Sequence, residues 1–119
     1  MMKVYYGRCV AIDNTPQYNR DVKLLKDLGW TIIPDLTTAQ KEEGYKRDGM
    51  EFFLKFIREE ADILVFRGMP SGMIGAGVFK EIEEARNKGI PVLELPSMIL
   101  SREMTVEQTR EYLCEVGKR

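Results

Sequence analysis

The chain has 119 residues, 44% of them hydrophobic, a formal net charge of −1 and no histidine. This length fits a single domain over residues 1–119, and the near-neutral charge argues against binding to a nucleic-acid polymer. The missing histidine excludes catalytic triads, histidine proton shuttles and histidine-ligated metals. The apolar runs are too short for a membrane span and the two cysteines are too few for a disulfide framework. We therefore expect a cytoplasmic protein with no membrane contact.

The first predicted element is a strand over Lys3 to Tyr6, with Gly7 and Arg8 at its carboxyl end. An arginine there can meet a phosphate or carboxylate of a ligand, although an ordinary solvated arginine is an equally good interpretation. The polar stretch from Ala11 to Asn19 predicts a loop over this position. Within it, Tyr18 either stacks on a ligand ring or packs beside the start of the next helix.

Helical spacing predicts a helix from Asn19 to Leu28, and an apolar run predicts the second strand from Trp30 to Ile33. The residues from Asp35 to Lys46 form a polar connection with little periodicity. Its length suggests a binding loop or lid, or a plain surface excursion. A continuous apolar stripe then predicts a helix from Asp48 to Glu60.

The segment from Ala61 to Pro96 carries the pattern of a strand–helix–strand unit. A strand opens at Asp62, the glycine-rich stretch from Gly68 to Gly77 follows, and a helix is predicted from Ala76 to Lys88. Another strand is predicted from Val92 to Leu95. In open parallel sheets ligands bind beyond the carboxyl ends of the strands, so the glycine loop and its helix N-terminus would face an anionic ligand.

Glu81 is the acidic residue of this helix that draws most interest. It lies at the edge of the apolar face, roughly 60° around the helix from Val78. From there it either looks into the ligand crevice, neither fully solvated nor buried, or is an ordinary surface glutamate. Farther on, residues 98–100 predict a short fifth strand or a loop, and Thr105 with Gln108 forms a capping box that predicts a final helix.

The alternation of strands and helices predicts an α/β, three-layer, flavodoxin-like or Rossmann-like fold. We expect a mainly parallel sheet of four or five strands in the order 2-1-3-4 or 2-1-3-4-5. The point where the strand order reverses then lies between the first and third strands. This arrangement puts Gly7 and Arg8 opposite the glycine loop, with Glu81 nearby.

Several short motifs resemble the nucleoside 2-deoxyribosyltransferase superfamily, which includes N-glycosidases of deoxynucleoside 5′-monophosphates. The resemblance covers most of the first 96 residues. The matching pieces are Val4 to Gly7, Ala61-Asp62, Pro70-Ser71, Gly75-Ala76-Gly77, and Glu81-Ile82 with Ala85.

The resemblance implies hydrolysis of an N-glycosidic bond, or deoxyribosyl transfer, on a nucleoside or its 5′-monophosphate. Glu81 would be the carboxylate nucleophile. The position of the family's acid/base aspartate is held by Leu54 here, so Asp48 and Glu51 are the candidate acids. No metal or cofactor is implied, and a homodimer is expected. The candidate substrate- or phosphate-binding residues are Tyr6, Gly7, Arg8, Tyr18, Pro70, Ser71, Gly72, Gly75 and Gly77.

A second hypothesis is a non-catalytic protein that binds a nucleotide, or another phosphorylated small molecule, through the loop from Gly68 to Gly77. Phosphoribohydrolase chemistry ranks last, because the loop has no Pro-Gly-Gly-x-Gly-Thr run. A true flavodoxin is disfavoured because no Ser/Thr-type phosphate loop follows the first strand. Base release from a nucleoside or nucleotide separates the enzyme from the binding module.

Overall fold

The structure, a computed structural model, describes residues 1–69, 71–96 and 105–117. Strands and helices alternate along most of these residues, as the sequence predicts. A short 3-10 helix, η1 (Val10–Ile12), lies between the first strand and the first α-helix. The other elements are β1 (Lys3–Gly7), α1 (Pro16–Asp27), β2 (Thr31–Ile33), α2 (Thr38–Asp48), α3 (Met50–Glu59), β3 (Ile63–Phe66), α4 (Ala76–Lys88), β4 (Val92–Glu94) and α5 (Val106–Glu115).

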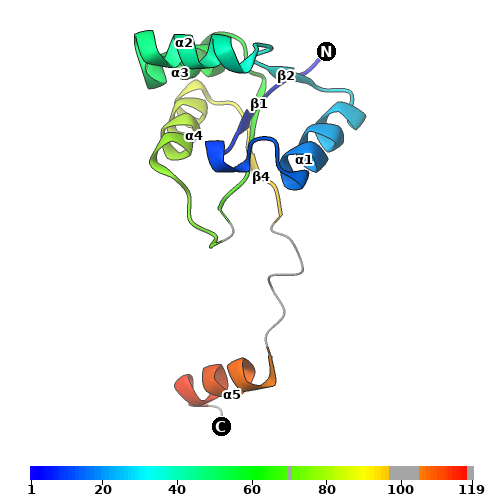
Figure 1. Cartoon of the computed structure of the whole chain (residues 1–119), viewed down its shortest axis with the longest axis vertical. Coiled ribbons are helices and arrows are strands. Elements are labelled where there is room, and N and C mark those ends of the chain that lie inside the picture. Colours follow the sequence, from blue (N-terminus) through cyan, green and yellow to red (C-terminus); the bar gives the residue numbers. More distant parts are fainter. Residues whose placement is uncertain (70, 97–104, 118–119) are drawn as a thin grey trace.

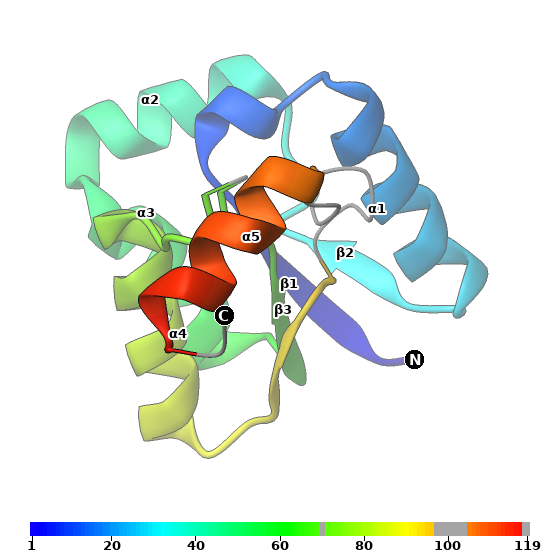
Figure 2. The same cartoon turned by 90° about the horizontal axis from the view of Figure 1, so that it is seen from below.

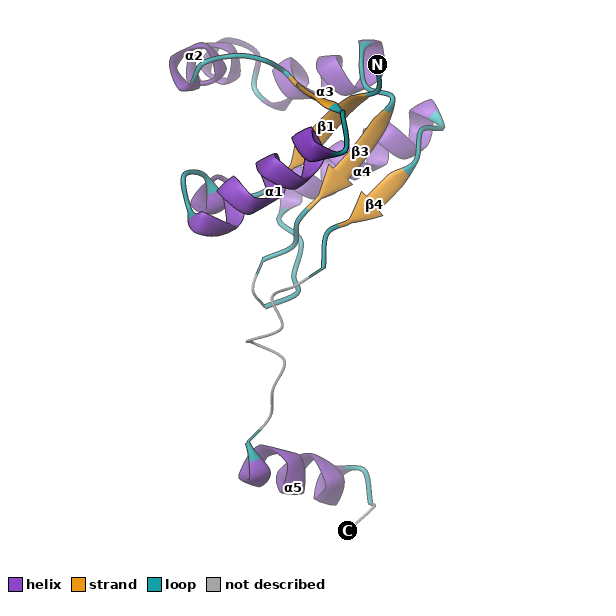
Figure 3. Ribbon diagram, turned by 90° about the vertical axis from the view of Figure 1, so that its right-hand side faces the viewer, coloured by secondary structure: helices purple, strands orange, loops and turns teal. Residues whose placement is uncertain are grey.

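The four described strands form one parallel sheet in the order β2-β1-β3-β4, which confirms the predicted α/β fold and strand order. β1 pairs with β3 in a register that sets Val4 beside Ile63 and Gly7 beside Phe66. The carboxyl ends of these two strands therefore finish together, at the point where the strand order reverses (Figure 3). The possible fifth strand over residues 98–100 lies outside the described residues.

Helices cover both faces of the sheet, with α1 on one side and α3 and α4 on the other (Figure 2). Because side chains alternate along a strand, Val4 and Tyr6 face the α1 side while Tyr5 faces the α3 and α4 side. All three are almost completely buried. The two neighbouring tyrosines thus carry one phenol to each face of the sheet, close to the carboxyl end of β1.

The structure corrects the polar stretch from Asp35 to Lys46, which contains helix α2 rather than an irregular connection. The helix begins at a capping box in which the Thr37 side chain accepts from Gln40 N. It packs closely on α3, because a Cβ atom at Gly44 would lie 2.2 Å from the ring of Phe52. The apolar period is weak because a glycine, rather than a row of large side chains, makes this contact.

One further helix start differs from its prediction and another agrees with it. α1 begins at Pro16, three residues before the predicted start, because the Thr15 side chain accepts from Tyr18 N and proline is favoured in a first helical turn. The predicted capping box of Thr105 and Gln108 does begin α5. That helix lies apart from the sheet (Figure 1), and no described helix is long and apolar enough to cross a bilayer.

Candidate functional site

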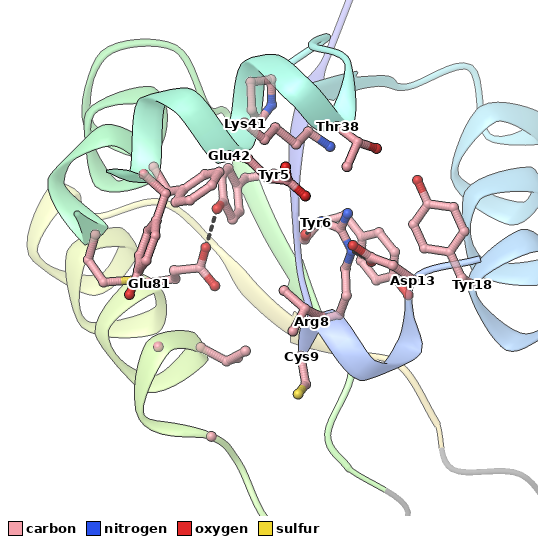
Figure 4. A pocket seen from close by; sticks show the side chains of 18 of the residues that line it. Tyr5, Tyr6, Arg8, Cys9, Asp13, Tyr18, Thr38, Lys41, Glu42 and Glu81 are labelled. Atoms are coloured by element: carbon pink, nitrogen blue, oxygen red, sulfur yellow. Dashed lines mark hydrogen bonds and ion pairs between the residues drawn. The ribbon is translucent and has the colours of Figure 1, made fainter. Parts of the chain in front are cut away.

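A cavity of about 700 Å³, which we call the pocket, opens at the carboxyl end of β1. Its walls come from β1, η1, α1, β2, α2, α3 and the first turns of α4. The volume lies within the range of small-molecule sites, and the position is the one where open parallel sheets bind ligands. Figure 4 shows the labelled polar side chains gathered around this space.

Glu81 lies in the pocket wall, one turn inside α4, and only 6% of it is exposed. Its carboxylate accepts a hydrogen bond from the Tyr5 hydroxyl, which reaches it from β1 (Figure 4). Gly7 lies beside this carboxylate, since a Cβ atom there would be in van der Waals contact with Glu81 Oε1, at 3.4 Å. The prediction that Glu81 would be only half-buried was wrong, because the helix turns this edge toward the sheet.

Burial raises the pKa of Glu81 to about 7, against the opposing effects of the Tyr5 hydrogen bond and the Arg8 charge. Burial also raises the pKa of Tyr5 well above its usual value, so that Tyr5 stays protonated and donates. Glu81 therefore changes its charge close to neutral pH. Such a carboxyl group can serve as a nucleophile when ionised or as a proton donor when neutral.

Arg8 is held at the side of the pocket by four contacts. Its Nε donates to Asp13 Oδ1 at 2.8 Å and its Nη1 to the Tyr6 carbonyl at 3.0 Å. The guanidinium carbon lies 5.1 Å from the ring centroid of Tyr6 and 5.2 Å from that of Tyr18, within cation–π range. The arginine is thus positioned before any ligand arrives.

Helix α2, which lies in the segment interpreted from the sequence as a binding loop or a surface excursion, supplies a polar wall of the pocket. Thr38, Lys41 and Glu42 from its first turns line the pocket. In Figure 4 Lys41 and Arg8 extend toward the same space from opposite walls. Burial, followed by the charge of Arg8, lowers the pKa of Lys41, while Asp13 and Asp35 act in the other direction.

On the face of the sheet that α1 covers, a buried ion pair joins α1 to Arg67, the residue that follows β3. Arg67 donates to both oxygens of Asp21, at 2.6 and 2.9 Å, and to the Pro96 carbonyl at 2.7 Å. The Tyr6 hydroxyl also donates to Asp21. This cluster fixes the position of α1 and therefore of Tyr18, which α1 carries into the pocket wall.

The structure brings six of the predicted site residues together in the pocket and leaves five others outside it. Asp48 is exposed and pairs with Arg47, while Glu51 is exposed and pairs with Arg58. Ser71 and Gly72 are exposed beyond the pocket, Gly7 lies behind Glu81, and Pro70 lies outside the described residues. The residues that line the pocket are Tyr6, Arg8, Tyr18, Gly75, Gly77 and Glu81.

Sequence reasoning missed Tyr5, Asp13, Lys41 and Glu42 as pocket residues. For Tyr5 a signal existed, because two adjacent tyrosines in a buried strand must send one phenol to each face. For Lys41 and Glu42 the sequence offered only the suggestion that their segment is a binding loop, because no helical period singles out either residue. Among the described residues no group of three or more His, Cys, Asp and Glu side chains is arranged to hold a metal ion.

Comparison with known proteins adds a fold but no sequence relative. No family model matches the chain, and no curated protein matches it. A solved structure that does match is the CMP N-glycosidase BcmB of Clostridium botulinum, with a TM-score of 0.50 and 17% identity over 98% of this chain and 99% of that one. At this identity the likeness shows the fold, and the fold fits the superfamily that the sequence motifs resemble.

Proposed function

We propose that this protein cleaves the N-glycosidic bond of a nucleoside or nucleotide, by hydrolysis or by transfer of the sugar. The observation that carries the proposal is the buried Glu81 carboxyl group, which titrates near pH 7 in a pocket of ligand size. The solved structure with the same fold is named for this class of reaction on CMP, which supports the proposal at a coarse level.

The reaction is a displacement at the anomeric carbon of the sugar. As the bond from C1′ to the base nitrogen breaks, its electron pair leaves with the base and positive charge develops at C1′ and the ring oxygen. Ionised Glu81 attacks C1′ or stabilises that charge, and a glycosyl ester is then opened by water or by an incoming base. Tyr5 acts as a positioning residue, since its hydroxyl holds one carboxylate oxygen.

The departing base needs a proton, and Glu42 is the best-placed source. Asp48 and Glu51, the acids suggested by the sequence, lie outside the pocket in ion pairs. Asp13 lies in the pocket, but its carboxylate is held by Arg8. Glu42 lines the pocket and has no hydrogen bond or ion pair within the described part of the chain.

Base release from a panel of ribo- and deoxynucleosides and their 5′-monophosphates, followed by chromatography, tests this proposal. We expect release by the wild-type protein, a loss of about a hundredfold or more in Glu81→Gln, and a smaller loss in Glu42→Gln. Glu83→Gln, an exposed change on the same helix, is the matched control. The absence of release from every compound would reject the enzyme and favour the nucleotide-binding module.

A further inference from the structure

We propose that Lys41 and Arg8 form an anion subsite for the 5′-phosphate of the ligand, so that this pocket selects a nucleoside 5′-monophosphate over the nucleoside. The inference extends the proposed function, because it names the substrate class of the same pocket. It gives helix α2 a role in binding the ligand, although none of the motifs that resemble the superfamily lies in this helix.

Arg8 contributes a preorganised donor. Its Nε and Nη1 are occupied by Asp13 and the Tyr6 carbonyl, whereas Nη2 has no acceptor among the residues described. The side chain is only 17% exposed, and the guanidinium lies against the rings of both Tyr6 and Tyr18, whose centroids are 6.0 Å apart. A guanidinium held in this way loses little side-chain freedom when it binds an oxyanion.

Lys41 contributes a charge that no described residue pairs with directly. It is partly buried in the pocket wall, and its ammonium makes no hydrogen bond or ion pair with a described residue. The lowered pKa of Lys41 agrees with this, since burial and Arg8 together outweigh the attraction of Asp13 and Asp35. An anion between the two cations would relieve both their repulsion and their loss of hydration.

The alternative place for a phosphate is the glycine loop at the start of α4. Gly75 and Gly77 line the pocket there, but Ser71, the side chain expected to help, does not. A helix N-terminus offers about half a unit charge, whereas this side of the pocket holds two cations, of which Arg8 is paired with Asp13 and Lys41 is not paired with a described residue. The buried carboxyl group of Glu81 also lies on α4, so a dianion at that end would repel it.

Four carboxyl groups face or approach this part of the pocket and set the limits of the subsite. Asp13 is engaged by Arg8 and Asp35 lies outside the pocket. Glu42 and Glu81 line it, with Glu81 held by Tyr5 on the α4 side. With a phosphate beside Lys41 and Arg8, the sugar would lie between the phosphate and Glu81. Attack of Glu81 on C1′ of the sugar requires this arrangement.

The test measures binding and does not depend on turnover. Affinities for a set of 5′-monophosphates and the matching nucleosides are measured by titration calorimetry in the Glu81→Gln background. Lys41→Gln, Lys41→Arg and Lys46→Gln are then added in turn; Lys46 is an exposed lysine on the same helix. Inorganic phosphate is titrated separately against the wild-type protein, with circular dichroism as the check on folding.

We expect a monophosphate to bind at least about tenfold more tightly than its nucleoside, as charge-assisted hydrogen bonds to phosphate would give. Lys41→Gln should remove most of that preference while changing nucleoside affinity less than about twofold. Lys41→Arg should keep part of the preference, and Lys46→Gln should leave it unchanged. Inorganic phosphate should compete with the monophosphate.

Two results would overturn the subsite. One is that the Glu81→Gln protein binds monophosphates and nucleosides equally well, or binds neither of them. The other is a preference that survives in folded Lys41→Gln, which would move the phosphate to the start of α4. Selective binding that depends on Lys41, without base release by the wild type, would reject the proposed reaction and leave the subsite standing.

Discussion

At the scale of single residues, the state of Glu81 reflects a balance between burial and two favourable contacts. Removing a carboxylate from water favours its neutral form, whereas the Tyr5 hydrogen bond and the Arg8 charge favour the ionised form. Burial dominates, so the pKa of Glu81 stays near 7 rather than near 4.5. The Tyr5 hydrogen bond opposes this rise and so increases the ionised fraction of the proposed nucleophile at neutral pH.

This balance predicts the pH dependence of base release. Because the proposed nucleophile must be ionised, kcat/KM should rise with pH with a midpoint near 7. In Tyr5→Phe the midpoint should move upward, since the hydrogen bond to the charged form is lost. Tyr6→Phe is the control, because its phenol meets Asp21 on the opposite face. A midpoint that stays in place in Tyr5→Phe would contradict the assignment.

The same pKa predicts how stability changes with pH. The folded pKa of Glu81 lies above its unfolded value of about 4.5, so the folded chain binds more protons between pH 4.5 and 7. Stability should therefore fall as pH rises through that window, by up to about 3 kcal/mol from this group.

Glu81→Gln removes this titration. Thermal or denaturant unfolding should find the variant more stable than the wild type at pH 8, with the difference shrinking or reversing at pH 5. The matched variant Glu83→Gln, at an exposed position of the same helix, should follow the wild type at both pH values. A pH-independent difference for Glu81→Gln would show that its buried carboxyl group is not the cause.

At the scale of elements, the buried pair of Arg67 and Asp21 joins α1 to the end of β3. Asp21→Ala would leave the Arg67 guanidinium buried without its partner, which costs about 3–5 kcal/mol in such pairs. Asp27→Ala on the same helix breaks only an exposed pair with Lys23 and should cost less than about 1 kcal/mol. Urea unfolding measures both. Equal costs would mean that the buried pair does not hold α1 in place.

The elements also explain what the sequence alone can and cannot predict. β1, β3 and α4 were located correctly because long-range burial leaves an apolar period or run in each of them. α2 was missed because it packs through Gly44 on Phe52 and keeps its other side chains polar. Because Lys41 and Glu42 belong to α2, two pocket residues were missed together with this helix. Glu81 was singled out from its motif, but its burial comes from the packing of α4 on the sheet, where Tyr5 and Gly7, which are distant in sequence, lie beside it.

At the scale of the whole molecule, packing on the sheet does not explain the position of α5. It lies beyond the sheet along the long axis of the molecule, and the chain reaches a radius of gyration of 17.3 Å, against about 13 Å for a compact domain of 100 residues (Figure 1). On its own a ten-residue helix is only marginally stable in water. Its apolar residues therefore need a surface to pack against.

That need leads to the expectation of a homodimer assembled through α5. Val106, Tyr112 and Val116 are between 46% and 68% exposed, and Leu93 on the edge strand β4 is 50% exposed.

We expect light scattering to give the mass of a dimer. Leu113→Glu, on the same apolar stripe of α5, should convert it to a monomer, because a carboxylate would be buried in the contact. Glu111→Lys, on the opposite face by helical geometry, should leave the dimer intact. A wild-type monomer would instead mean that α5 covers apolar surface of its own chain, and Leu113→Glu would then lower the unfolding temperature at unchanged mass.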